Sequence, residues 1–540
     1  MSRFVRPSKY RHVYGNAAKK EEWYDNIKVS NNAWDTNLIA SNGKYISVNW
    51  NASGGGAFAL VPTSRRGKLP DIYPLARGHT ATVLDTAFSP FDDDVLASAS
   101  DDGTVGIWNV AKEDVWSVLD LSEKERDKAG GVKDISPVSK IQAGGRKVGQ
   151  VLFHPTASNV LAAATNDSIK LFDLASSTQA SKIELTGFTD SIQSLDFNWS
   201  GNTLVATCRD RKIRTFDPRV GSKAVQEAES HGGIKGARVV WCGALDRFIT
   251  TGFSKMSDRQ LFLWDSGNVT KPLKTVLLDS SNGVIMPFWS DNNICFLAGK
   301  GDGNIRYYEL ENDELHYLTE YKSTDPQRGM SFIPRRSLNV DENEIARAYK
   351  VTGNAVQPIS FVVPRRAETF QSDIFPPAPS SVPALSSQEF FAGKTANPNL
   401  ISLEDGSGVK GDAIVAHAPA AIPVSPAAPT PAAPGPVAPP TPAAAQAPAP
   451  APVAIPSPAI PIKTEASPLS PSADLGKSRF RSRENGAGPA QAGERTAELV
   501  EENEKLRAQV QQQLTMIREL EVENERLRTN QQRVREALLQ

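Results

Sequence analysis

Histidine, cysteine and glycine are the residue types in this chain whose spacing could support catalysis or ligand binding. The six histidines are scattered, and the sequence has no His-Glu-x-x-His, Gly-x-Ser-x-Gly or Walker motif. Cys208, Cys242 and Cys295 lie far apart, without the paired spacing of metal ligands. The glycines of residues 53–56 lead into a strand-like segment, which argues against a phosphate-binding loop. These patterns predict no enzyme, no metal site and no cofactor.

A repeated strand pattern supplies the scaffold on which any site must lie. Five alternating apolar segments end in an aromatic residue followed by Asn, Asp or Glu. Apart from a first gap of 64 residues, which holds an insertion, the aromatics recur with a period in the forties. Such a period is typical of WD-repeat propellers built from several short strands per unit. A turn residue precedes each aromatic at one constant offset, where it can accept backbone N–H bonds. The turn residues are Asp102, Asn166, Asp210, Asp258 and Asp302, and the aromatics are Trp108, Phe172, Phe216, Trp264 and Tyr308.

Strand-like segments on both sides of these five repeats bring the total to seven units. They lie at residues 36–40, 45–50 and 57–61 upstream, and at residues 330–333, 345–351 and 359–363 downstream. The sequence therefore predicts an all-β, seven-bladed WD-repeat propeller over residues 1–366. A propeller has to close, so we expect an N-terminal strand near residues 3–10 to complete the last blade. The insertion at residues 112–138 is rich in Lys, Glu and Asp and is expected to be a solvated surface loop.

His79 follows Gly78 at the point where WD repeats place a His that bonds across its blade. Its expected partners are Ser98 or Ser100 and the turn residue Asp102, with Trp108 completing the group. Such a group forms a buried polar network, so a structural role is favoured over catalysis. The residues assigned to this structural network are His79, Asp102, Trp108, Asp210, Asp258, Trp264 and Asp302.

The composition of the chain bounds its class and its partners. A formal net charge of −1, from 60 basic and 61 acidic residues, argues against a nucleic-acid partner. The N-terminus lacks the apolar run of a signal peptide, and no stretch of about 18 apolar residues occurs. Together with the separated cysteines, these features predict a soluble cytosolic protein with reduced thiols and no integral membrane contact.

The sequence resembles the coronin family over residues 1–402. The resemblance rests on long blocks in family order, among them Ser-Lys-Tyr-Arg-His-Val at residues 8–13, Tyr-Asp-Asn-Ile-Lys-Val-Ser at residues 24–30 and Asp-Pro-Gln-Arg-Gly-Met at residues 325–330. It implies a propeller that binds the side of filamentous actin, and a tail that oligomerises and engages the actin-related protein 2/3 complex. It also implies an extension packed under the propeller, which we place at residues 367–403 because of their aromatics and prolines.

Residues 404–493 follow the extension and are mostly Pro and Ala over residues 419–471. Such a composition cannot form a core, so we expect a disordered, semi-rigid spacer. Residues 477–483 form a short basic cluster. This cluster is either a solvated flank or a contact with an acidic polymer such as an actin filament or a microtubule.

Residues 494–540 carry a heptad repeat that predicts an α-helical coiled coil. Leu recurs at d with Val or Ile at a, which favours a parallel homodimer, and Asn at a fixes the register. A homotrimer is the alternative. The core positions are Leu499, Asn503, Leu506, Val510, Ile517, Leu520, Asn524, Leu527, Val534 and Leu538, with Gln513 and Gln531 as polar layers.

Basic residues crowd the N-terminal segment, which makes it the best candidate for contact with an acidic actin surface. Lys28 matches the basic position of the family block at residues 24–30 and is the leading candidate. A loop after the first blade comes second. The full set of candidates is Lys28, Arg3, Arg6, Lys9, Arg11, Lys19, Lys20, Arg65 and Arg66.

These observations predict an actin-filament binding and crosslinking protein that regulates actin assembly and the actin-related protein 2/3 complex. Its expected location is the cytoplasm, at the cytoskeleton and cortical actin patches. A fold does not fix a function, however. The alternative is a WD-repeat scaffold for a non-actin partner, such as a vesicle coat or a ubiquitin-ligase complex.

Overall fold

The structure is a computed structural model of the chain. It describes residues 6–409 except residues 54–55, 113–114 and 367–368, together with four α-helical residues of the tail, Ala508, Gln511, Gln512 and Thr515. The chain divides into two compact units, residues 1–427 and 428–540. The candidate Arg3, the predicted spacer beyond residue 409 and the predicted coiled-coil core lie outside the described residues.

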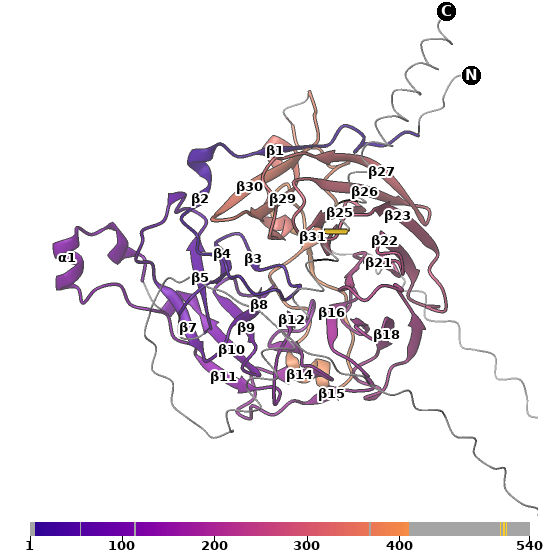
Figure 1. Ribbon diagram of the computed structural model, residues 1–540, viewed down its shortest axis with the longest axis horizontal. Coiled ribbons are helices and arrows are strands. Elements are labelled where there is room, and N and C mark those ends of the chain that lie inside the picture. Colours follow the sequence, from indigo (N-terminus) through magenta and orange to yellow (C-terminus); the bar gives the residue numbers. More distant parts are fainter. Residues whose placement is uncertain are drawn as a thin grey trace, which may run out of the picture. The chain divides into compact units, whose positions relative to one another are not determined.

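Seven sheets are arranged as blades around one axis, as Figure 1 shows, which confirms the predicted propeller. Within each blade, consecutive strands pair antiparallel. Blade 1 contains β3 (Ile39–Ser41), β4 (Tyr45–Trp50), β5 (Gly56–Pro62) and β7 (Leu75–His79); blade 2 contains β8 (Val83–Phe88), β9 (Val95–Ser100), β10 (Thr104–Asn109) and β11 (Ser139–Gln142). Blade 3 contains β12 (Gln150–Phe153), β13 (Val160–Ala164), β14 (Ile169–Asp173) and β15 (Ile183–Leu185); blade 4 contains β16 (Ile192–Phe197), β17 (Leu204–Cys208), β18 (Lys212–Phe216) and β19 (Gln226–Glu229).

The remaining blades continue the same order. Blade 5 contains β20 (Arg238–Trp241), β21 (Arg247–Phe253), β22 (Arg259–Asp265) and β23 (Lys274–Asp279); blade 6 contains β24 (Ile285–Ser290), β25 (Ile294–Gly299), β26 (Ile305–Glu311) and β27 (Glu314–Tyr321). Blade 7 is built on β28 (Gly329–Phe332), β29 (Glu344–Val351) and β30 (Ala355–Val362). Short 3-10 turns lie at Lys20–Glu22, Val110–Lys112, Ser117–Asp120, Arg335–Ser337 and Val340–Glu342.

Strand β22 shows why such a sequence forms blades. Successive side chains of a strand point to opposite faces, so its alternate residues reach different neighbours. Leu261 and Leu263 are buried in a cluster shared with blade 6, and Trp264 is buried in a cluster shared with blade 4. A blade inside the ring therefore has two apolar faces, and the hydrophobic core lies between the blades.

The N-terminal segment closes the ring at blade 7. Strands β1 (Tyr14–Ala17) and β2 (Tyr24–Asp25) both pair with β30, and β2 pairs in turn with β6 (Gly67–Lys68). Closure by the N-terminus was expected, but the position predicted for the strand, residues 3–10, was wrong. Residues 6–10 run instead toward blade 6, where Tyr10 is buried and its hydroxyl accepts a hydrogen bond from the Asn292 side chain at 2.9 Å.

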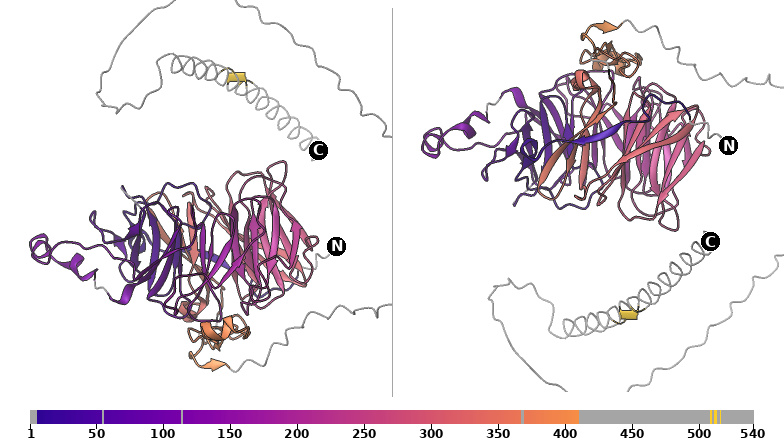
Figure 2. Two further views of the ribbon diagram at one scale, coloured as in Figure 1. Left: turned by 90° about the horizontal axis from the view of Figure 1, so that it is seen from below. Right: turned by 90° about the horizontal axis from the view of Figure 1, so that it is seen from above.

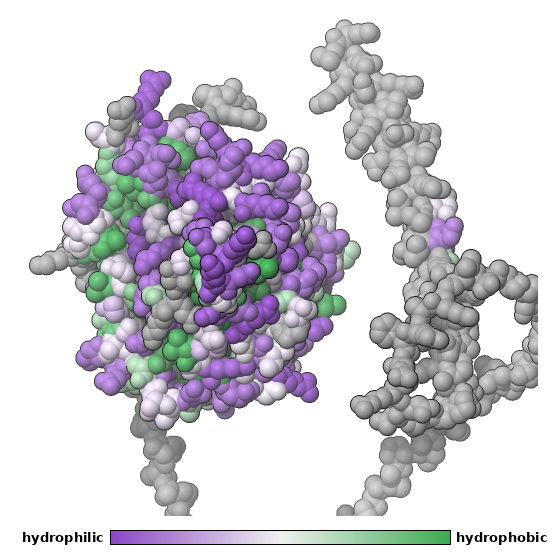
Figure 3. Space-filling model, turned by 90° about the vertical axis from the view of Figure 1, so that its left-hand side faces the viewer, coloured by the Kyte–Doolittle hydropathy of each residue, from purple (hydrophilic) through white to green (hydrophobic). Residues whose placement is uncertain are grey.

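The insertion between β10 and β11 projects from the ring and carries α1 (Glu123–Lys128), at the left of Figure 1. Figure 3 looks onto this side of the molecule, which is largely hydrophilic. The prediction of a solvated loop was wrong for the base of the insertion. Trp116 stacks on Tyr45 with ring centroids 5.6 Å apart, and Val115 and Leu119 are buried. The charged residues of the tip masked these apolar anchors in the sequence.

The C-terminal extension packs on one end of the blades, as Figure 2 shows. It contains α2 (Ser387–Phe391), whose first turn has a capping box, and a small sheet of β31 (Ala378–Pro379), β32 (Leu400–Ile401) and β33 (Gly408–Val409). The backbone N–H of Leu385 donates to the carbonyl oxygen of Thr156, in the turn between β12 and β13. The ring of Phe390 packs on that of His154, with ring centroids 4.3 Å apart. We call this end the extension face. The turns between the second and third strands, and the connections between blades, form the opposite end, which we call the open face.

Candidate functional site

Lys28 lies on the open face, where the N-terminal segment turns inward from the rim. Its side chain is exposed, and its carbonyl oxygen accepts a hydrogen bond from the N–H of Asn51, in the turn between β4 and β5, at 2.7 Å. A few residues further on, the carbonyl oxygen of Ser30 accepts a hydrogen bond from Arg328 at 2.7 Å. The backbone around Lys28 is therefore held to blade 1 on one side and blade 7 on the other.

Residues 30–38, which we call the axial strap, continue from Lys28 across the axis of the ring. The indole N–H of Trp34 donates to Gly149 of blade 3 at 2.9 Å, while Lys147 Nζ lies 3.5 Å from the centre of that indole ring. Lys300 of blade 6 donates to the carbonyl oxygen of Trp34, and Arg238 of blade 5 donates to that of Asp35. Only a segment near the axis can contact so many blades, so the strap ties them together beside Lys28.

The groups beneath the strap are buried and charged. Burial raises the pKa of Asp85 and of Asp196 to about 7, although the charge of the buried Arg238 opposes this. Burial also lowers the pKa of Lys300 to about 8, against the favourable charge of Asp35. Burial thus disfavours the charged forms of Asp85, Asp196 and Lys300.

The structure separates the basic residues that the sequence groups together. Arg6 pairs with Glu309 and Glu311 of blade 6, and the Lys9 ammonium donates to the carbonyl oxygen of Asp373 in the extension. These two residues therefore serve the extension side of the molecule. Arg11 is exposed and lines a groove of that rim, between the segment before β1 and strand β27.

The remaining candidates lie around blades 1 and 7. Arg65 makes a bidentate ion pair with Asp120 of the insertion, at 2.8 and 2.7 Å, and Arg66 pairs with Glu22 at 2.7 Å. Lys19 and Lys20 are exposed on the rim beside β30. Arg6, Arg65 and Arg66 thus hold the protein's own segments together. Lys28, like Arg11, Lys19 and Lys20, shows no ion pair among the described contacts.

The structure brings together His79, the last residue of β7 in blade 1, and Ser98, Asp102 and Trp108 of blade 2. His79 lies 2.7 Å from the Ser98 hydroxyl through Nε2 and 3.3 Å from the Asp102 carboxylate through Nδ1, and the Trp108 indole donates to Ser98 at 2.8 Å. Burial lowers the pKa of His79, although the charge of Asp102 opposes this. Burial disfavours the charge of Asp102, but hydrogen bonds from Thr104 and Thr80 outweigh it and hold its pKa well below the usual range. The lowered pKa favours the neutral form of His79, which faces a carboxylate.

The other turn residues have different partners. Asp210 accepts hydrogen bonds from Thr189 and from the buried Arg214, at 2.8 and 2.6 Å. Asp302 pairs with Arg259 at 2.7 Å, which links blade 6 to blade 5. Asp258 accepts a hydrogen bond from the Ser254 hydroxyl within its own turn, at 3.0 Å. One constant sequence offset therefore serves several kinds of interaction.

Blade 5 contains a His that the sequence analysis missed. His231 Nε2 lies 2.9 Å from the Thr250 hydroxyl, which also accepts a hydrogen bond from the Trp264 indole at 2.9 Å. His231 stands at the start of the connection before β20, as His79 does before β8, so the recurring Trp could have pointed to it. Burial lowers the pKa of His231 to about 4.

A second group that the sequence did not reveal is a set of cations on the open face of blades 4 and 5. They come from the turn between β17 and β18, the connection before β20 and the turn between β21 and β22. Their sequence separation hides them, because only the ring brings these turns side by side. The residues are Arg209, Arg211, Lys235 and Lys255.

The described residues show no cluster of His, Cys, Asp and Glu that could hold a metal ion. Cys208, Cys242 and Cys295 are buried and unpaired, and burial raises the pKa of each thiol. Within the part of the chain that the structure describes, no helix is long and apolar enough to cross a membrane.

Repeat models match several parts of this fold. Residues 72–109 and 180–217 match the WD domain, G-beta repeat, residues 356–398 match a type of WD40 repeat, and residues 3–68 match a domain of unknown function (DUF1899). A solved structure, the WD40 domain from Toxoplasma gondii coronin, covers 73% of this chain and 97% of its own, with a TM-score of 0.66 and 28% identity. The protein is thus a WD-repeat β-propeller.

Relatives define the family more narrowly. Coronin-A of Dictyostelium discoideum is 42% identical over 77% of this chain and 89% of its own length. Human Coronin-2A is 39% identical over 74% of this chain and 75% of its own length. The chain belongs to the coronin family. It is also 52% identical to the coronin-like protein of Schizosaccharomyces pombe over 74% of this chain, but spans only 65% of the length of that relative.

Proposed function

We propose that this coronin-family protein binds the sides of actin filaments through the open face of its propeller, with Lys28 as the leading contact. The observation that carries the proposal is the placement of Lys28, which is exposed, lacks an ion pair among the described contacts and is held between blades 1 and 7. An acidic filament attracts such a cation, and the rigid backbone limits the entropy that binding costs. Of the other candidates, Lys19 and Lys20 are exposed on the adjacent rim.

The test is cosedimentation of the full chain with actin filaments. Lys28→Glu replaces an attractive charge by a repulsive one, and we expect a rise in Kd of about tenfold, largest at low salt. Lys271→Glu is the matched control, because Lys271 is an exposed lysine in the connection between β22 and β23 on the extension face. Equal binding by Lys28→Glu and Lys271→Glu would refute the role of Lys28. Failure of the wild-type chain to pellet with filaments would refute the proposed function itself.

We further propose that the heptads of residues 494–540 join two chains, with three as the alternative, and that this makes the protein a filament crosslinker. Linking two weak propeller sites raises avidity by roughly 100-fold if the spacer can span both sites. A chain ending at residue 490 should bind filaments weakly and lose bundling in low-speed sedimentation. Sedimentation equilibrium of residues 490–540 separates the two assembly states by mass.

Family membership also supports a role in regulating the actin-related protein 2/3 complex, in the cytoplasm and at cortical actin patches. The open face and the tail could hold a filament and the complex at once. Branch counting in assembly assays with and without the full chain tests this part of the proposal. An unchanged branch density would contradict it.

A further inference from the structure

The open face of blades 4 and 5 carries cations that the protein does not use internally. Arg209, Arg211 and Lys255 are exposed, and none has an ion pair among the described contacts. Lys235 donates to the Asn282 side chain at 2.8 Å and lies over the Phe253 ring at 4.9 Å. The adjacent Lys212 differs, because it pairs with Glu227. We call Arg209, Arg211, Lys235 and Lys255 the blade 4–5 cations.

Of the turn acids beside these cations, one is paired with a buried arginine and the other keeps its charge. Asp210 pairs with the buried Arg214 and accepts a hydrogen bond from Thr189. Asp258 accepts from Ser254 within its own turn. Asp190, in the connection before β16, and Glu229, at the end of β19, are exposed acids beside the surface. The blade 4–5 cations outnumber Asp190, Glu229 and Asp258, so the turns present a net positive charge to solvent, which attracts an acidic partner.

Two apolar side chains stand among the same cations. Ile234 precedes Lys235 and is 76% exposed, and Met256 follows Lys255 and is 83% exposed. The two loops that carry them pack together, since a Cβ on Gly232 would lie 2.9 Å from the Lys255 side chain. Methionine and arginine are enriched in protein interfaces, and exposed apolar groups within a polar rim are typical of such surfaces. This composition suits a protein partner.

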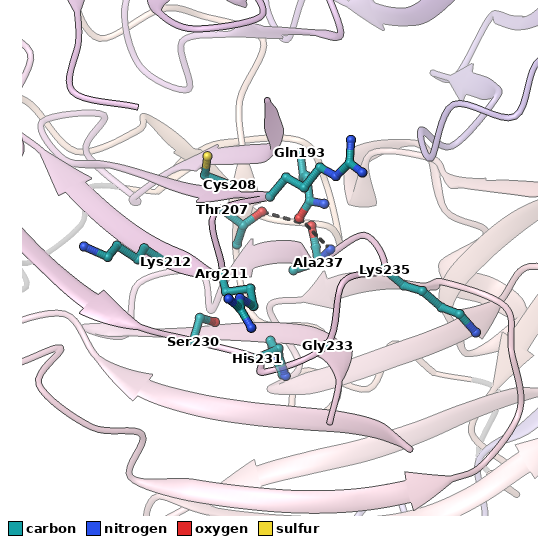
Figure 4. Close-up of a pocket in the computed structure, with 11 residues that line it drawn as sticks. Gln193, Thr207, Cys208, Arg211, Lys212, Ser230, His231, Gly233, Lys235 and Ala237 are labelled. Carbon is teal, nitrogen blue, oxygen red and sulfur yellow. Dashed lines mark hydrogen bonds between the residues drawn. The ribbon is translucent and has the colours of Figure 1, made fainter. Parts of the chain in front are cut away.

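A small crevice between blades 4 and 5 opens among these side chains, and Figure 4 shows Arg211, Ser230, His231 and Lys235 around it. The buried atoms His231 Nδ1 and Ser230 Oγ have no hydrogen-bond partner in the described structure. Thr250 accepts a hydrogen bond from the Trp264 indole, and its own proton can then be donated to His231 Nε2. His231 Nδ1 and Ser230 Oγ are both buried in the wall of the crevice, beneath a rim that carries the exposed Arg211 and Lys235.

We propose that the blade 4–5 cations, Ile234 and Met256 form a docking surface for an acidic segment of a partner protein. Under the proposed function, on which this inference rests, the partner is the side of the actin filament. The surface continues from the Lys28 region along the axial strap, because Lys147 lies over Trp34 of the strap and is close enough to Arg209 for its charge to act there. The proposed contact surface for the filament thus spans the open face rather than the N-terminal rim alone.

The test compares charge reversals at the two ends of the same blades in the full chain. Arg209→Glu with Lys255→Glu alters the open face. Lys223→Glu with Lys271→Glu is the matched control, because both lysines are exposed in connections of blades 4 and 5 at the extension face. Unchanged thermal unfolding establishes that both variants fold. We expect the first variant to bind filaments about tenfold more weakly at low salt, with a smaller salt dependence, and the control to bind as wild type.

Three results would overturn the inference. In the first, the open-face variant binds filaments as well as the control does, while Lys28→Glu binds them more weakly. This result would refute the docking surface and leave the proposed function intact. If wild type does not bind filaments, a fluorescent glutamate-rich peptide becomes the probe, and equal peptide binding by both variants would also refute the docking surface. The third result concerns vesicles with about 20% anionic lipid. If the open-face variant loses binding to these vesicles but still binds filaments and the peptide, the surface would be assigned to membranes instead.

Discussion

Blades 2 and 5 place the same types of side chain in the same positions and obtain different networks. At blade 2 the His79 ring lies between the Ser98 hydroxyl and the Asp102 carboxylate. In blade 5 the ring of His231 reaches Thr250, but Asp258 bonds to Ser254 instead.

The cause of the difference is the length of the turn. Ser98 and Trp108 are 10 residues apart, whereas Thr250 and Trp264 are 14 apart. The longer turn of blade 5 forms its own hydrogen bonds, between Ser254 and Asp258, and these hold the carboxylate away from the His. Identical spacing between an Asp and a Trp therefore does not guarantee a shared role.

Blade 5 has another charged anchor in place of the Asp–His contact. The residue after Asp258 is Arg259, which is buried and binds Asp279 through two hydrogen bonds of 2.6 Å and Asp302 of blade 6 at 2.7 Å. The corresponding residue of blade 2, Gly103, has no side chain. The turn of blade 2 thus meets the preceding blade through the contact between Asp102 and His79, whereas the turn of blade 5 is tied to the following blade through Arg259.

The largest expected effect is the loss of this tie. Arg259→Leu leaves Asp302 without its cation and Asp279 with Arg306 alone. Breaking a buried ion pair from one side costs about 3–5 kcal/mol, so the free energy of unfolding should fall by that amount. Urea unfolding followed by tryptophan fluorescence measures it. A loss as small as that of an exposed pair, such as the pair broken by Arg66→Ala, would show that the tie does not stabilise the ring.

The next effect separates the two turn acids. Asp102→Asn removes the carboxylate that faces His79 and accepts hydrogen bonds from Thr80 and Thr104, and should cost about 2–3 kcal/mol. Asp258→Asn is the matched control and should cost less than about 1 kcal/mol, because Asn can still accept from Ser254. Equal losses in urea unfolding would mean that the two networks are equivalent after all.

The same pair of variants should differ in its response to pH. The pKa of Asp102 is lowered in the folded state, so its stabilisation is present above the ordinary carboxyl range, near pH 4, and is lost as the pH falls below it. The difference between wild type and Asp102→Asn should therefore shrink below about pH 4.

The propeller and its seven units could be predicted because their signals are local: alternation along single strands, and an aromatic that recurs at a fixed period. The closing strand could not be placed as well, since β1 is four residues that gain their stability by pairing with β30. The role of Lys28 as the leading actin contact stays a prediction. The ion pairs of Arg6 and Arg65 could not be predicted from the sequence, because they join segments far apart in the chain. The blade 4–5 cations become a group only when the ring places their turns together.

The last expected effect compares the two histidines themselves. The pKa of His231 falls to about 4 on folding, against about 6.5 in an unfolded chain. Between these values the unfolded state binds more protons, so the stability that this group influences decreases as the pH falls from about 6.5 toward 4. At pH 5 the difference amounts to about 2 kcal/mol. His231→Gln should remove that part of the pH dependence, as measured by urea unfolding at pH 7 and pH 5. His79→Gln should remove less, because the charge of Asp102 opposes the effect of burial on His79. The reverse order would indicate that a negative group reaches His231 and that its network is closed like that of blade 2.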